Sequence, residues 1–432
     1  MKALNKFGRL GWPLGKHLDS LHKVTSTAPS FRGLFSRFRS VISFFQRTFS
    51  YRFFLVKIVR SRRMDHGTTL RTREEFVRVK FLDGRMVVHS RAHRDIGFRE
   101  FRNVKVSPNR RGGFITRGSR ILSNDNLLGS IPKYYFANTS VGGIEAQYGP
   151  LVVANWSSLK KRSAGEAIFI GSMAPHNWYH WLIDFLPSIY FLRELPEQYS
   201  DYPVLVPREG LQKENWRRAL SLSLSGRQML EVGGSELWKL RKLLVVEPVT
   251  RVHPRPLRTE NFRLSIAPSL VRSFSEEIKL SANPISSIQG RRRIFLARGT
   301  GDSRNYNQDE IFAVCSKFGF EFVELPSLSF DESVRLFENA QAIVSPHSAG
   351  LANIIFCREG TPVTYWTWAG ETVDNWYENI AFISGVELRK IEIPTGPGTA
   401  DPRGEDYFLS PRRLREELEK VDNLLQSRAS PV

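Results

Sequence analysis

The chain has 432 residues, of which 41% are hydrophobic and 12% aromatic, enough to build two or three folded domains and to exclude an intrinsically disordered protein. Its two cysteines, Cys315 and Cys357, exclude a disulfide framework and fit a reducing compartment, although one bridge between them stays open. The net charge of +20 would suit a nucleic-acid-binding protein, but 13 of these 20 charges lie in residues 1–64. The rest of the chain has an ordinary charge balance, so no nucleic-acid partner is expected.

Residues 1–64 form a basic segment with 14 lysines and arginines and one acidic residue, Asp19. From residue 31 onward, aromatic and aliphatic residues alternate with arginines, and the longest uncharged run, residues 40–46, is far shorter than the roughly 20 apolar residues of a spanning helix. The segment also lacks the features of a secretory signal. We expect a basic amphipathic helix on an anionic membrane surface; a flexible basic arm and a partner-binding helix are the alternatives.

Residues 65–165 are predicted to be rich in short strands. Alternating apolar residues on both sides of Asp83 and Gly84 indicate a hairpin. Residues 134–138 and 149–156 have the composition of further strands. We therefore expect a small β-rich region ahead of the main domains.

Residues 166–290 predict a first α/β domain, because short apolar strands alternate with amphipathic helices. The expected strands are residues 167–172, 203–207 and 242–249, and the expected helices are residues 174–195 and 213–224. Such alternation is typical of a parallel sheet covered by helices. The polar stretch at residues 281–292 is the best candidate for a linker to the next domain.

Residues 291–395 predict a second α/β domain with five strands, each of the first four followed by a helix. The expected strands are residues 292–298, 320–325, 342–348, 361–367 and 386–393, and the expected helices are residues 308–319, 329–340, 350–357 and 375–385. Ser329 and Glu332 have the spacing of a capping box. Residues 396–432 contain a linker and a final helix, with Ser410 at its N-cap and Pro411 in its first turn.

The loop at residues 297–310 carries two arginines in positions suited to an anion. Arg298 closes a predicted strand and Arg304 precedes a predicted helix. Two guanidinium groups beside a helix start can bind a phosphate group in bidentate fashion, with help from the helix dipole. The alternative is a solvated basic loop.

The loop at residues 345–353 is the second candidate for an anion site. Ser348 and Gly350 allow backbone N–H groups to approach an anion, and His347 and Asn353 supply side-chain donors. The loop lacks the spacing of dinucleotide-binding and P-loop motifs. We therefore expect a phosphate-bearing ligand, but neither a nicotinamide cofactor nor a hydrolysed triphosphate.

Three motifs together give the chain a resemblance to a known family. They are R-x-x-x-x-x-R-x-x-N, with Arg298, Arg304 and Asn307, then L-S-F-x-E, then A-x-I-V-x-P-H-x-A-G-L-x-N-I-I-F-C. With the upstream N-W-Y-H-W-x-x-D-F-L-P, this series resembles glycosyltransferase family 61 over about residues 166–395. That family includes bacterial capsular-polysaccharide proteins and eukaryotic xylosyl- and N-acetylglucosaminyltransferases. Two departures are Ser348, where the family usually has Gly, and Gln308, where Glu commonly follows the Asn.

The resemblance implies the fold with two Rossmann domains, called GT-B, and an inverting transfer from a nucleotide sugar, commonly UDP-linked, to a glycan acceptor. It also implies that Arg298, Arg304, Asn307, His347, Ser348 and Asn353 bind the donor. The sequence itself is consistent with the GT-B fold in one respect. It contains no D-x-D, the usual metal-binding motif of the other large glycosyltransferase fold. Arginines can instead neutralise the leaving diphosphate, so we expect neither a metal nor another cofactor.

The segment 174–187, APHNWYHWLIDFLP, places His176, His180 and Asp184 on one side of a predicted helix. A zinc site is disfavoured, because no Glu follows the first His and no third ligand cluster is evident. A structural pair of His180 and Asp184 is the second interpretation. We favour a catalytic pair on the acceptor side, in which one member takes the proton of the acceptor hydroxyl. The sequence does not decide which member acts.

The aromatic segment at residues 365–379 is a candidate surface for sugar rings. Trp366, Trp368 and Trp376 are expected to stack on the donor or acceptor sugar, with core packing expected for at least one of them. The nearby acidic residues are rivals for the catalytic base: Glu371, Asp374 and Glu378.

The sequence thus predicts an α/β protein with two Rossmann-like domains facing a cleft and a small β-rich region before them. We expect an inverting glycosyltransferase, peripheral to the inner membrane on the cytoplasmic side of a bacterium, that builds polysaccharide or lipid-linked glycan. The alternative is a non-catalytic nucleotide- or glycan-binding protein with the same fold.

Overall fold

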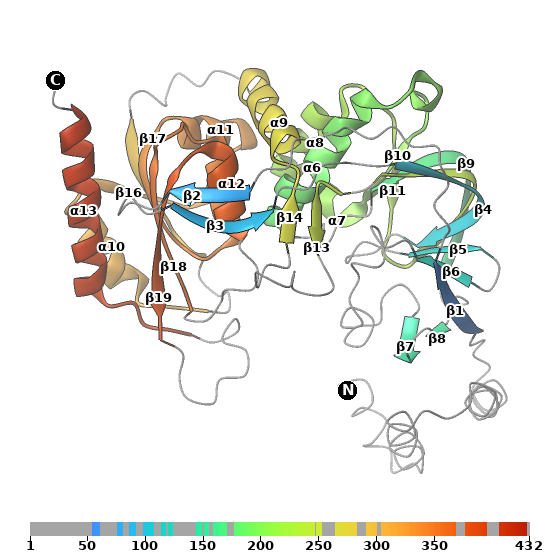
Figure 1. Ribbon diagram of the computed structural model, residues 1–432, viewed down its shortest axis with the longest axis horizontal. Coiled ribbons are helices and arrows are strands. Elements are labelled where there is room, and N and C mark those ends of the chain that lie inside the picture. The colour runs from blue at the N-terminus through green and yellow to red at the C-terminus, as the bar shows by residue number, and fades with distance from the viewer. Residues whose placement is uncertain are drawn as a thin grey trace, which may run out of the picture.

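The computed structural model describes most of the chain after residue 158 and eight strands before it. The described residues are 54–60, 76–80, 86–91, 98–107, 114–117, 120–123, 144–148, 151–154, 159–170, 177–246, 248–252, 264–282, 291–299, 304–368, 376–394 and 406–429. Most of the basic segment, the predicted strand at 134–138 and most of the predicted linker lie outside these residues. Two large sheets, two small two-stranded sheets and the helices that lie between and beside the large sheets make up the described part (Figure 1).

The first sheet mixes parallel and antiparallel strands. In spatial order it contains β11 (Met229–Val232), β10 (Val204–Pro207), β9 (Lys160–Ile170), β12 (Glu236–Val246), β4 (Phe98–Ser107), β5 (Phe114–Arg117), β6 (Arg120–Ser123), β1 (Phe54–Arg60), β8 (Leu151–Ala154) and β7 (Ile144–Tyr148). The four strands from β11 to β12 are parallel, and β12 pairs antiparallel with β4. The strands predicted at 167–172, 203–207 and 242–249 are thereby confirmed.

Two expectations about the first half of the chain need correction. The basic segment was expected to be helical, but its part Phe54–Arg60 is strand β1, which pairs with β6 and β8. The boundary expected between residues 165 and 166 falls inside β9, and strands from both sides of it join the same sheet. Pairing between strands far apart in sequence therefore decides this part of the fold.

The parallel part of the first sheet is buried on both faces, which explains its continuous apolar runs. One face, with Ile168 and Leu244 side by side, packs against helices. The other face, with Phe169 and Val245, packs against apolar residues of β4 and β5, including Phe101. Helices therefore cover one face only, and strands of the same sheet close the other.

The helices of the first half form a layer against this sheet. They are α5 (Trp178–His180), a π-helical turn (Trp181–Phe185), α6 (Leu186–Tyr190), α7 (Arg208–Leu211), α8 (Glu214–Leu224) and α9 (Pro268–Ser281). The helices predicted at 174–195 and 213–224 are confirmed for their described residues. Trp181 is completely buried, and its indole ring packs against Gly210. A Cβ atom at position 210 would lie only 2.3 Å from this ring, so a residue with a side chain would clash there. A short pair of strands, β13 (Thr250–Val252) and β14 (Leu264–Ile266), follows the layer.

The second sheet consists of five parallel strands, as the sequence predicts. Its spatial order is β16 (Phe320–Val323), β15 (Arg292–Leu296), β17 (Ala340–Pro346), β18 (Pro362–Trp368) and β19 (Glu387–Ile393). The connecting helices are α10 (Gln308–Ser316), α11 (Phe330–Glu338), a 3₁₀ helix (Ala349–Phe356) and α12 (Trp376–Ser384), and the chain ends in α13 (Pro411–Ala429). The capping box of Ser329 and Glu332 and the capping of α13 by Ser410 are also confirmed.

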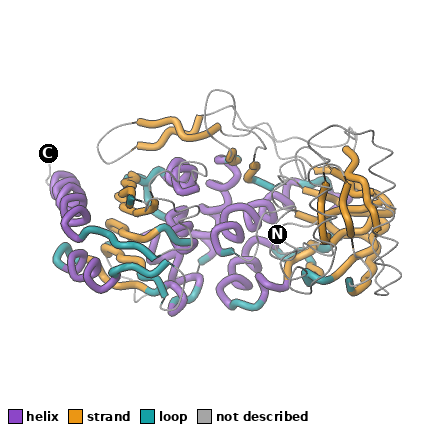
Figure 2. The backbone as a smooth tube through the Cα atoms, turned by 90° about the horizontal axis from the view of Figure 1, so that it is seen from below, coloured by secondary structure: helices purple, strands orange, loops and turns teal. Residues whose placement is uncertain are grey.

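Helices cover both faces of the second sheet. In Figure 1, α10 and α13 lie on its outer face, away from the rest of the molecule, where they bury a core that includes Trp366 and Leu414. On the inner face, α11, α12 and the 3₁₀ helix share one hydrophobic core with the helices of the first half. Figure 2 shows the helices between the two sheets from below. The predicted hairpin of β2 (Phe76–Lys80) and β3 (Met86–Arg91) is confirmed, and β2 lies beside α12 and β19 rather than beside the first sheet.

Polar contacts also join the two halves. Arg218 of α8 donates two hydrogen bonds to Asp331 of α11, of 3.1 and 3.0 Å. Arg272 of α9 donates to the carbonyl of Ile383 in α12 at 3.0 Å. The mixed α/β class is confirmed, whereas the helices between the two sheets form a shared core where the sequence suggested two sheets facing a cleft. The GT-B arrangement stays a prediction.

Two further observations concern the described helices and the two cysteines. None of the described helices is long and apolar enough to cross a membrane. Cys315 and Cys357 are both buried and both free, so the bridge that the sequence left open is not formed.

Candidate active site

The strand order of the second sheet creates a candidate site where the carboxyl ends of its strands lie, here called the carboxyl edge. The chain leaves β15 toward β16 on one side and leaves β17 toward β18 on the other, so the connections diverge between β15 and β17. Ligands of open α/β sheets bind at the carboxyl ends of the strands at such a switch point. Arg298 follows β15 and His347 follows β17, so both candidate loops lie at this point.

Arg298 presents an unsatisfied cation at this edge. Two of its guanidinium nitrogens, Nε and Nη1, are buried and have no hydrogen-bond partner among the residues that the structure describes. Its backbone is held from both sides by the Gln308 side chain, which accepts from the Arg298 N–H at 2.7 Å and donates to its carbonyl at 3.2 Å. Buried polar groups without partners are rare in proteins and call for a ligand or a functional reason.

Arg304, the second arginine of this loop, has an unusual backbone conformation. Its φ of 71° is in the left-handed region, which is uncommon for a residue with a large side chain. The guanidinium lies 5.9 Å from the ring centre of Trp368, the last residue of β18. The second arginine of the predicted clamp is thus aimed across the carboxyl edge of the sheet.

His347 is neutral at physiological pH. Burial lowers its pKa to about 4, and the positive charges of Arg304 and Arg298 act in the same direction, against the opposing effect of Glu378. Its Nδ1 lies 3.2 Å from Oγ1 of Thr367. A neutral imidazole keeps one N–H donor and one acceptor nitrogen. His347 can therefore donate a hydrogen bond to an anion while Arg298 and Arg304 supply the charge.

The loop that follows His347 is fixed by hydrogen bonds. The Ser348 carbonyl accepts a hydrogen bond of 2.6 Å from the hydroxyl of Tyr377. Asn353 is 2% exposed and donates at 2.7 Å to the Gly350 carbonyl, while its Oδ1 has no partner within the described residues. One of the two N–H groups of the Asn353 amide is thus used inside the 3₁₀ helix, and donation of a hydrogen bond from Asn353 to the ligand stays a prediction.

Asn307 also forms hydrogen bonds within the protein. Its side-chain amide donates to the Leu409 carbonyl and to Glu310, at 3.0 and 2.7 Å, and its oxygen accepts from the Leu409 N–H at 3.0 Å. All of its polar atoms are thus engaged by the protein. These bonds hold the C-terminal segment, and binding of the donor by Asn307 stays a prediction.

The pair of His180 and Asp184 forms as the sequence predicts, but in a π-helical turn. Nδ1 of His180 lies 2.6 Å from Oδ2 of Asp184. The Asp184 carbonyl accepts from Ser188, whose hydroxyl in turn accepts from the N–H of Val249. The side chain of Asp184 is 2% exposed and that of His180 is 16% exposed. Turns of this kind inside α-helices are frequent at functional sites.

The first turn of α12 joins this pair to the carboxyl edge of the second sheet. The ring of Trp376 contacts His180 edge to face, with ring centres 5.1 Å apart, and its carbonyl accepts from the Tyr179 hydroxyl at 3.2 Å. The next residue, Tyr377, contacts His347 with ring centres 4.9 Å apart. The ring of Tyr179 contacts both His180 and Tyr377, so a continuous series of ring contacts leads from His180 to His347.

The three tryptophans differ in their access to a ligand. Trp366 is completely buried and donates to the Tyr407 hydroxyl at 2.9 Å, so it has no face for a sugar, and the expectation of stacking is wrong for this residue. Trp368 is 4% exposed and faces Arg304. Trp376 is only partly buried and stands beside His180, which makes it the best placed of the three.

Among the rival bases, Glu378 lies within the described residues. It is 5% exposed and accepts a hydrogen bond of 3.0 Å from the hydroxyl of Tyr365, so it is not accessible to an acceptor. Glu371, Asp374 and His176 lie outside the described residues. The described part of the chain contains no group of three His, Cys, Asp or Glu side chains that could hold a metal ion. The expectation of a metal-free site stays a prediction.

Two residues of the site were missed by sequence reasoning. Tyr377 connects His347 to Ser348, and Tyr407 connects Trp366 to the loop of Arg304 through stacking of its ring on Tyr306. Tyr377 lies within the aromatic segment that the sequence marked, which was a usable signal. Tyr407 gives no such signal, because its contacts are all distant in sequence.

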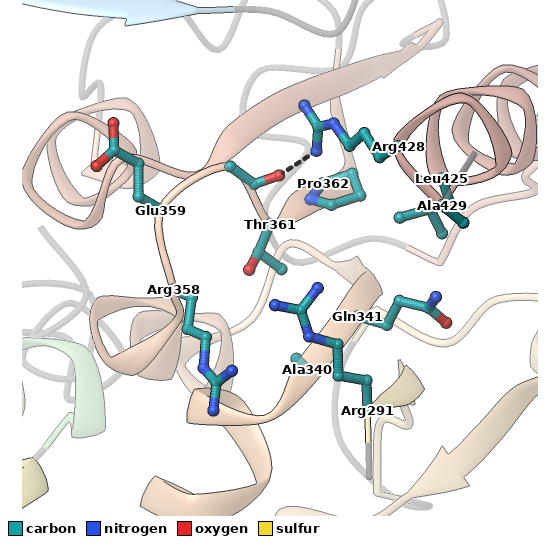
Figure 3. A pocket seen from close by; sticks show the side chains of 11 residues that line it. Arg291, Ala340, Gln341, Arg358, Glu359, Thr361, Pro362, Leu425, Arg428 and Ala429 are labelled. Carbon is teal, nitrogen blue, oxygen red and sulfur yellow. Dashed lines mark hydrogen bonds between the residues drawn. The ribbon is translucent and has the colours of Figure 1, made fainter. Parts of the chain in front are cut away.

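A separate pocket of about 370 Å³ lies at the opposite edge of the second sheet (Figure 3). Its wall includes the first residues of β17 and β18, the end of α13 and Arg291. One of its arginines, Arg428, is already bonded to the Gly360 carbonyl at 2.7 Å and to Glu387 at 2.9 Å. This pocket is at the amino ends of the strands and is not part of the candidate active site.

Fold and site together define an α/β protein in which two arginines and a neutral histidine lie at the carboxyl ends of a parallel sheet and a His–carboxylate pair lies on the helix layer. A family model, described as Glycosyltransferase 61, matches residues 178–364, which include both parts of this site. This match supports the resemblance to glycosyltransferase family 61 that the motifs of the sequence carry.

The other comparisons add little. No curated protein matches the chain. Among solved structures, the metal-soaked flavodiiron core of Flv1 from Synechocystis sp. PCC6803 is similar at 13% identity and a TM-score of 0.21, over 49% of this chain and 47% of that one. The chain thus spans about half the length of that protein, and a similarity this low carries no argument about fold or function.

Proposed function

We propose that the protein is an inverting glycosyltransferase that moves a sugar from a nucleotide-sugar donor, UDP-linked, to a glycan acceptor in polysaccharide or glycoconjugate assembly. The observation that carries the proposal is the guanidinium of Arg298. Two of its nitrogens are buried and have no partner among the described residues, in a residue that follows β15 at the switch point of the sheet and lies near the neutral His347. Such a site suits a diphosphate better than an uncharged ligand.

In this proposal, the second sheet binds the donor. Arg298 and Arg304 contact the diphosphate and stabilise the negative charge that grows on it as the sugar leaves. His347 donates its N–H to a phosphate oxygen. Two fixed arginines can provide the charge stabilisation that a metal provides elsewhere, so no metal is assigned to the reaction.

The acceptor lies on the side of α5 in this proposal. His180 is the base, because its side chain is partly exposed, whereas Asp184 is almost fully buried and holds the imidazole through Nδ1. Nε2 of His180 removes the proton of the acceptor hydroxyl, and the oxygen attacks the anomeric carbon. The bond from that carbon to the diphosphate oxygen breaks, and the nucleoside diphosphate leaves with inverted configuration at the sugar. Trp376, in contact with His180, stacks on the acceptor sugar.

A GT-B-type division of labour, with the donor on the second sheet and the acceptor on the first half of the chain, is part of the proposal. So is a location at the inner face of a bacterial membrane, where residues 1–64 bind anionic lipid and bring the enzyme to a lipid-linked or growing glycan. The support for this location is the concentration of 14 basic residues in that segment.

The test is thermal stabilisation by a panel of nucleotide sugars and nucleoside diphosphates, with and without chelator. A ligand at 100 times its Kd raises the unfolding free energy by about 2.7 kcal/mol. Arg298→Ala should lose about 1.5–3 kcal/mol of binding free energy. Arg291→Ala is the matched control, since this exposed arginine lies beside the other end of β15.

Three outcomes decide the matter. Stabilisation of the wild type and of Arg291→Ala, but not of Arg298→Ala, supports the donor site. Equal stabilisation of all three proteins moves the donor site elsewhere. Tight nucleotide binding without transfer to any glycan acceptor would favour the alternative, a non-catalytic nucleotide-binding protein.

A further inference from the structure

We propose that residues 406–410, here called the C-terminal brace, are a positioning element of the donor site that sets the places of Arg298 and Arg304. The brace precedes α13 and lies outside the segment that the family model matches. The inference rests on the proposed function, because it assigns a role to residues that hold the two proposed diphosphate ligands.

The brace binds the residue that follows Arg304. The Asp406 carboxylate accepts from the backbone N–H of Asn305 at 2.7 Å and from its side-chain amide at 3.2 Å. The N–H of Tyr407 donates to the Asn305 carbonyl at 2.9 Å. Both backbone groups of Asn305 are therefore used by the brace.

The next two residues of the loop are held as well. The rings of Tyr306 and Tyr407 stack in parallel, with centres 5.3 Å apart. Asn307 exchanges two hydrogen bonds with the backbone of Leu409, each of 3.0 Å. Residues 406–409 of the brace thus contact residues 305–307 of the loop in turn, through both backbone and side-chain groups.

The contacts continue from the loop to Arg298. The Tyr306 hydroxyl donates to Oε1 of Gln308 at 3.0 Å, and the same side chain binds the backbone N–H and carbonyl of Arg298. A Gln is needed here because the side chain must accept from one group and donate to the other, and a carboxylate cannot donate. Gln308, the departure from the usual Glu of the family, therefore fits its partners.

The brace also explains how Arg304 keeps its left-handed backbone. A residue with φ of 71° holds this conformation only where its surroundings fix it. The bonds of the brace to Asn305 provide that constraint on one side. They require a firm anchor, which Leu409 and the apolar face of α13 supply, since Leu409 is 2% exposed and Leu414 is completely buried.

Asp406 is the residue to change, because it is exposed and its loss should leave the core intact. In Asp406→Ala, amide hydrogen exchange in a peptide covering residues 305–312 should become at least tenfold faster, and trypsin should cleave faster after Arg304. Asp406→Asn should restore much of the protection, because its side-chain oxygen still accepts from the Asn305 N–H. Asp422→Ala is the control: it removes an ion pair of 2.8 Å between α13 and Arg293 without touching the brace.

The same variants test the link to the donor site. For UDP as the probe, Kd should rise about tenfold in Asp406→Ala, which corresponds to about 1.4 kcal/mol, and should stay unchanged in Asp422→Ala. The donor KM should rise without a rise in the acceptor KM, a split that a general loss of stability would not produce. Unchanged exchange in residues 305–312 would overturn the inference. So would faster exchange with an unchanged UDP affinity.

Failure of the proposed function gives a different result. If UDP and the other nucleoside diphosphates do not bind the wild type, the donor site is wrong. Exchange and cleavage then still decide whether the brace holds the arginine loop. Loss of binding in Arg298→Ala but not in Asp406→Ala would keep the donor site and remove the brace from it.

Discussion

The carboxylate of Asp184 lies 2.6 Å from Nδ1 of His180 and is shielded from solvent, whereas the imidazole remains partly exposed. A His and an Asp four residues apart in the sequence do not show which of the two is the base and which one orients it, whereas their difference in exposure distinguishes the two roles. The buried member can orient its partner and stabilise its charged form, but it cannot reach an acceptor. The exposed edge of His180 is the only part of the pair that can touch a substrate.

The first prediction concerns this pair. His180→Gln should lower turnover by about 10²–10⁴-fold, the usual contribution of a general base, with donor affinity unchanged. Asp184→Asn should also lower turnover, because it loses the charge that stabilises the imidazolium. Initial rates and melting temperatures of both variants, each with and without chelator, are the measurements. Normal rates per folded molecule would leave the pair with a structural role, and loss of wild-type activity on chelation would indicate a metal site.

The second prediction concerns the pH dependence of stability. The pKa of His347 falls from 6.5 to about 4 on folding, so the unfolded chain takes up this proton first as the pH falls. Stability is therefore fully present above about pH 6.5 and declines toward pH 4, where the loss from this one group reaches about 3 kcal/mol. Urea unfolding of the wild type and His347→Gln between pH 4 and 7.5 measures it. The difference in unfolding free energy between the two should shrink in acid, and a constant difference would contradict the assignment.

The third prediction concerns the packing of Trp181. A Cβ at residue 210 would come within 2.3 Å of the indole ring, which is completely buried and cannot move aside. Gly210→Ala should lower the unfolding free energy by at least about 1–3 kcal/mol, as overpacking does. Gly165→Ala is the matched control, because a Cβ there would meet only Arg241, at 3.9 Å. Equal melting temperatures of the two variants would show that Trp181 packs in another way.

The fourth prediction concerns the contact between the two halves. Removing Arg218 leaves the mostly buried carboxylate of Asp331 without its bidentate partner. Arg218→Ala should lower the unfolding free energy by about 1–3 kcal/mol. In a double-mutant cycle with Asp331→Ala, the coupling energy should be clearly above that of Arg412 and Glu416, an exposed pair within α13. A coupling energy near zero would mean that apolar packing alone joins the halves.

The fifth prediction concerns the membrane. Strand β1 starts at Phe54 and pairs on both sides, so a deletion should end before it. A protein without residues 1–50 should keep its melting temperature and its turnover on a soluble acceptor. It should no longer sediment with vesicles rich in anionic lipid at physiological salt, since each basic residue near the surface contributes about 1 kcal/mol. Unchanged sedimentation would assign membrane binding to another surface.

Much of the second half of the protein follows from its sequence. Apolar runs separated by helical segments predicted five parallel strands in their correct places, and all five form. Loops after parallel strands share one edge of the sheet, so Arg298 and His347 had to lie near each other whatever the details of packing. The spacing of His180 and Asp184 on one helical turn likewise determined their contact.

Only the tertiary structure decided what surrounds these groups. Asn307 and Trp366 lie in the predicted region, but the first is used by Leu409 and the second by Tyr407, residues 102 and 41 positions away in the chain. Two other contacts also join segments that are far apart in the sequence: the pairing of β1 with β6 and β8, and the contact of Trp376 with His180. Periodicity and turn signals report interactions between neighbours along the chain. Contacts between distant segments depend on how whole layers pack, and no local pattern encodes them.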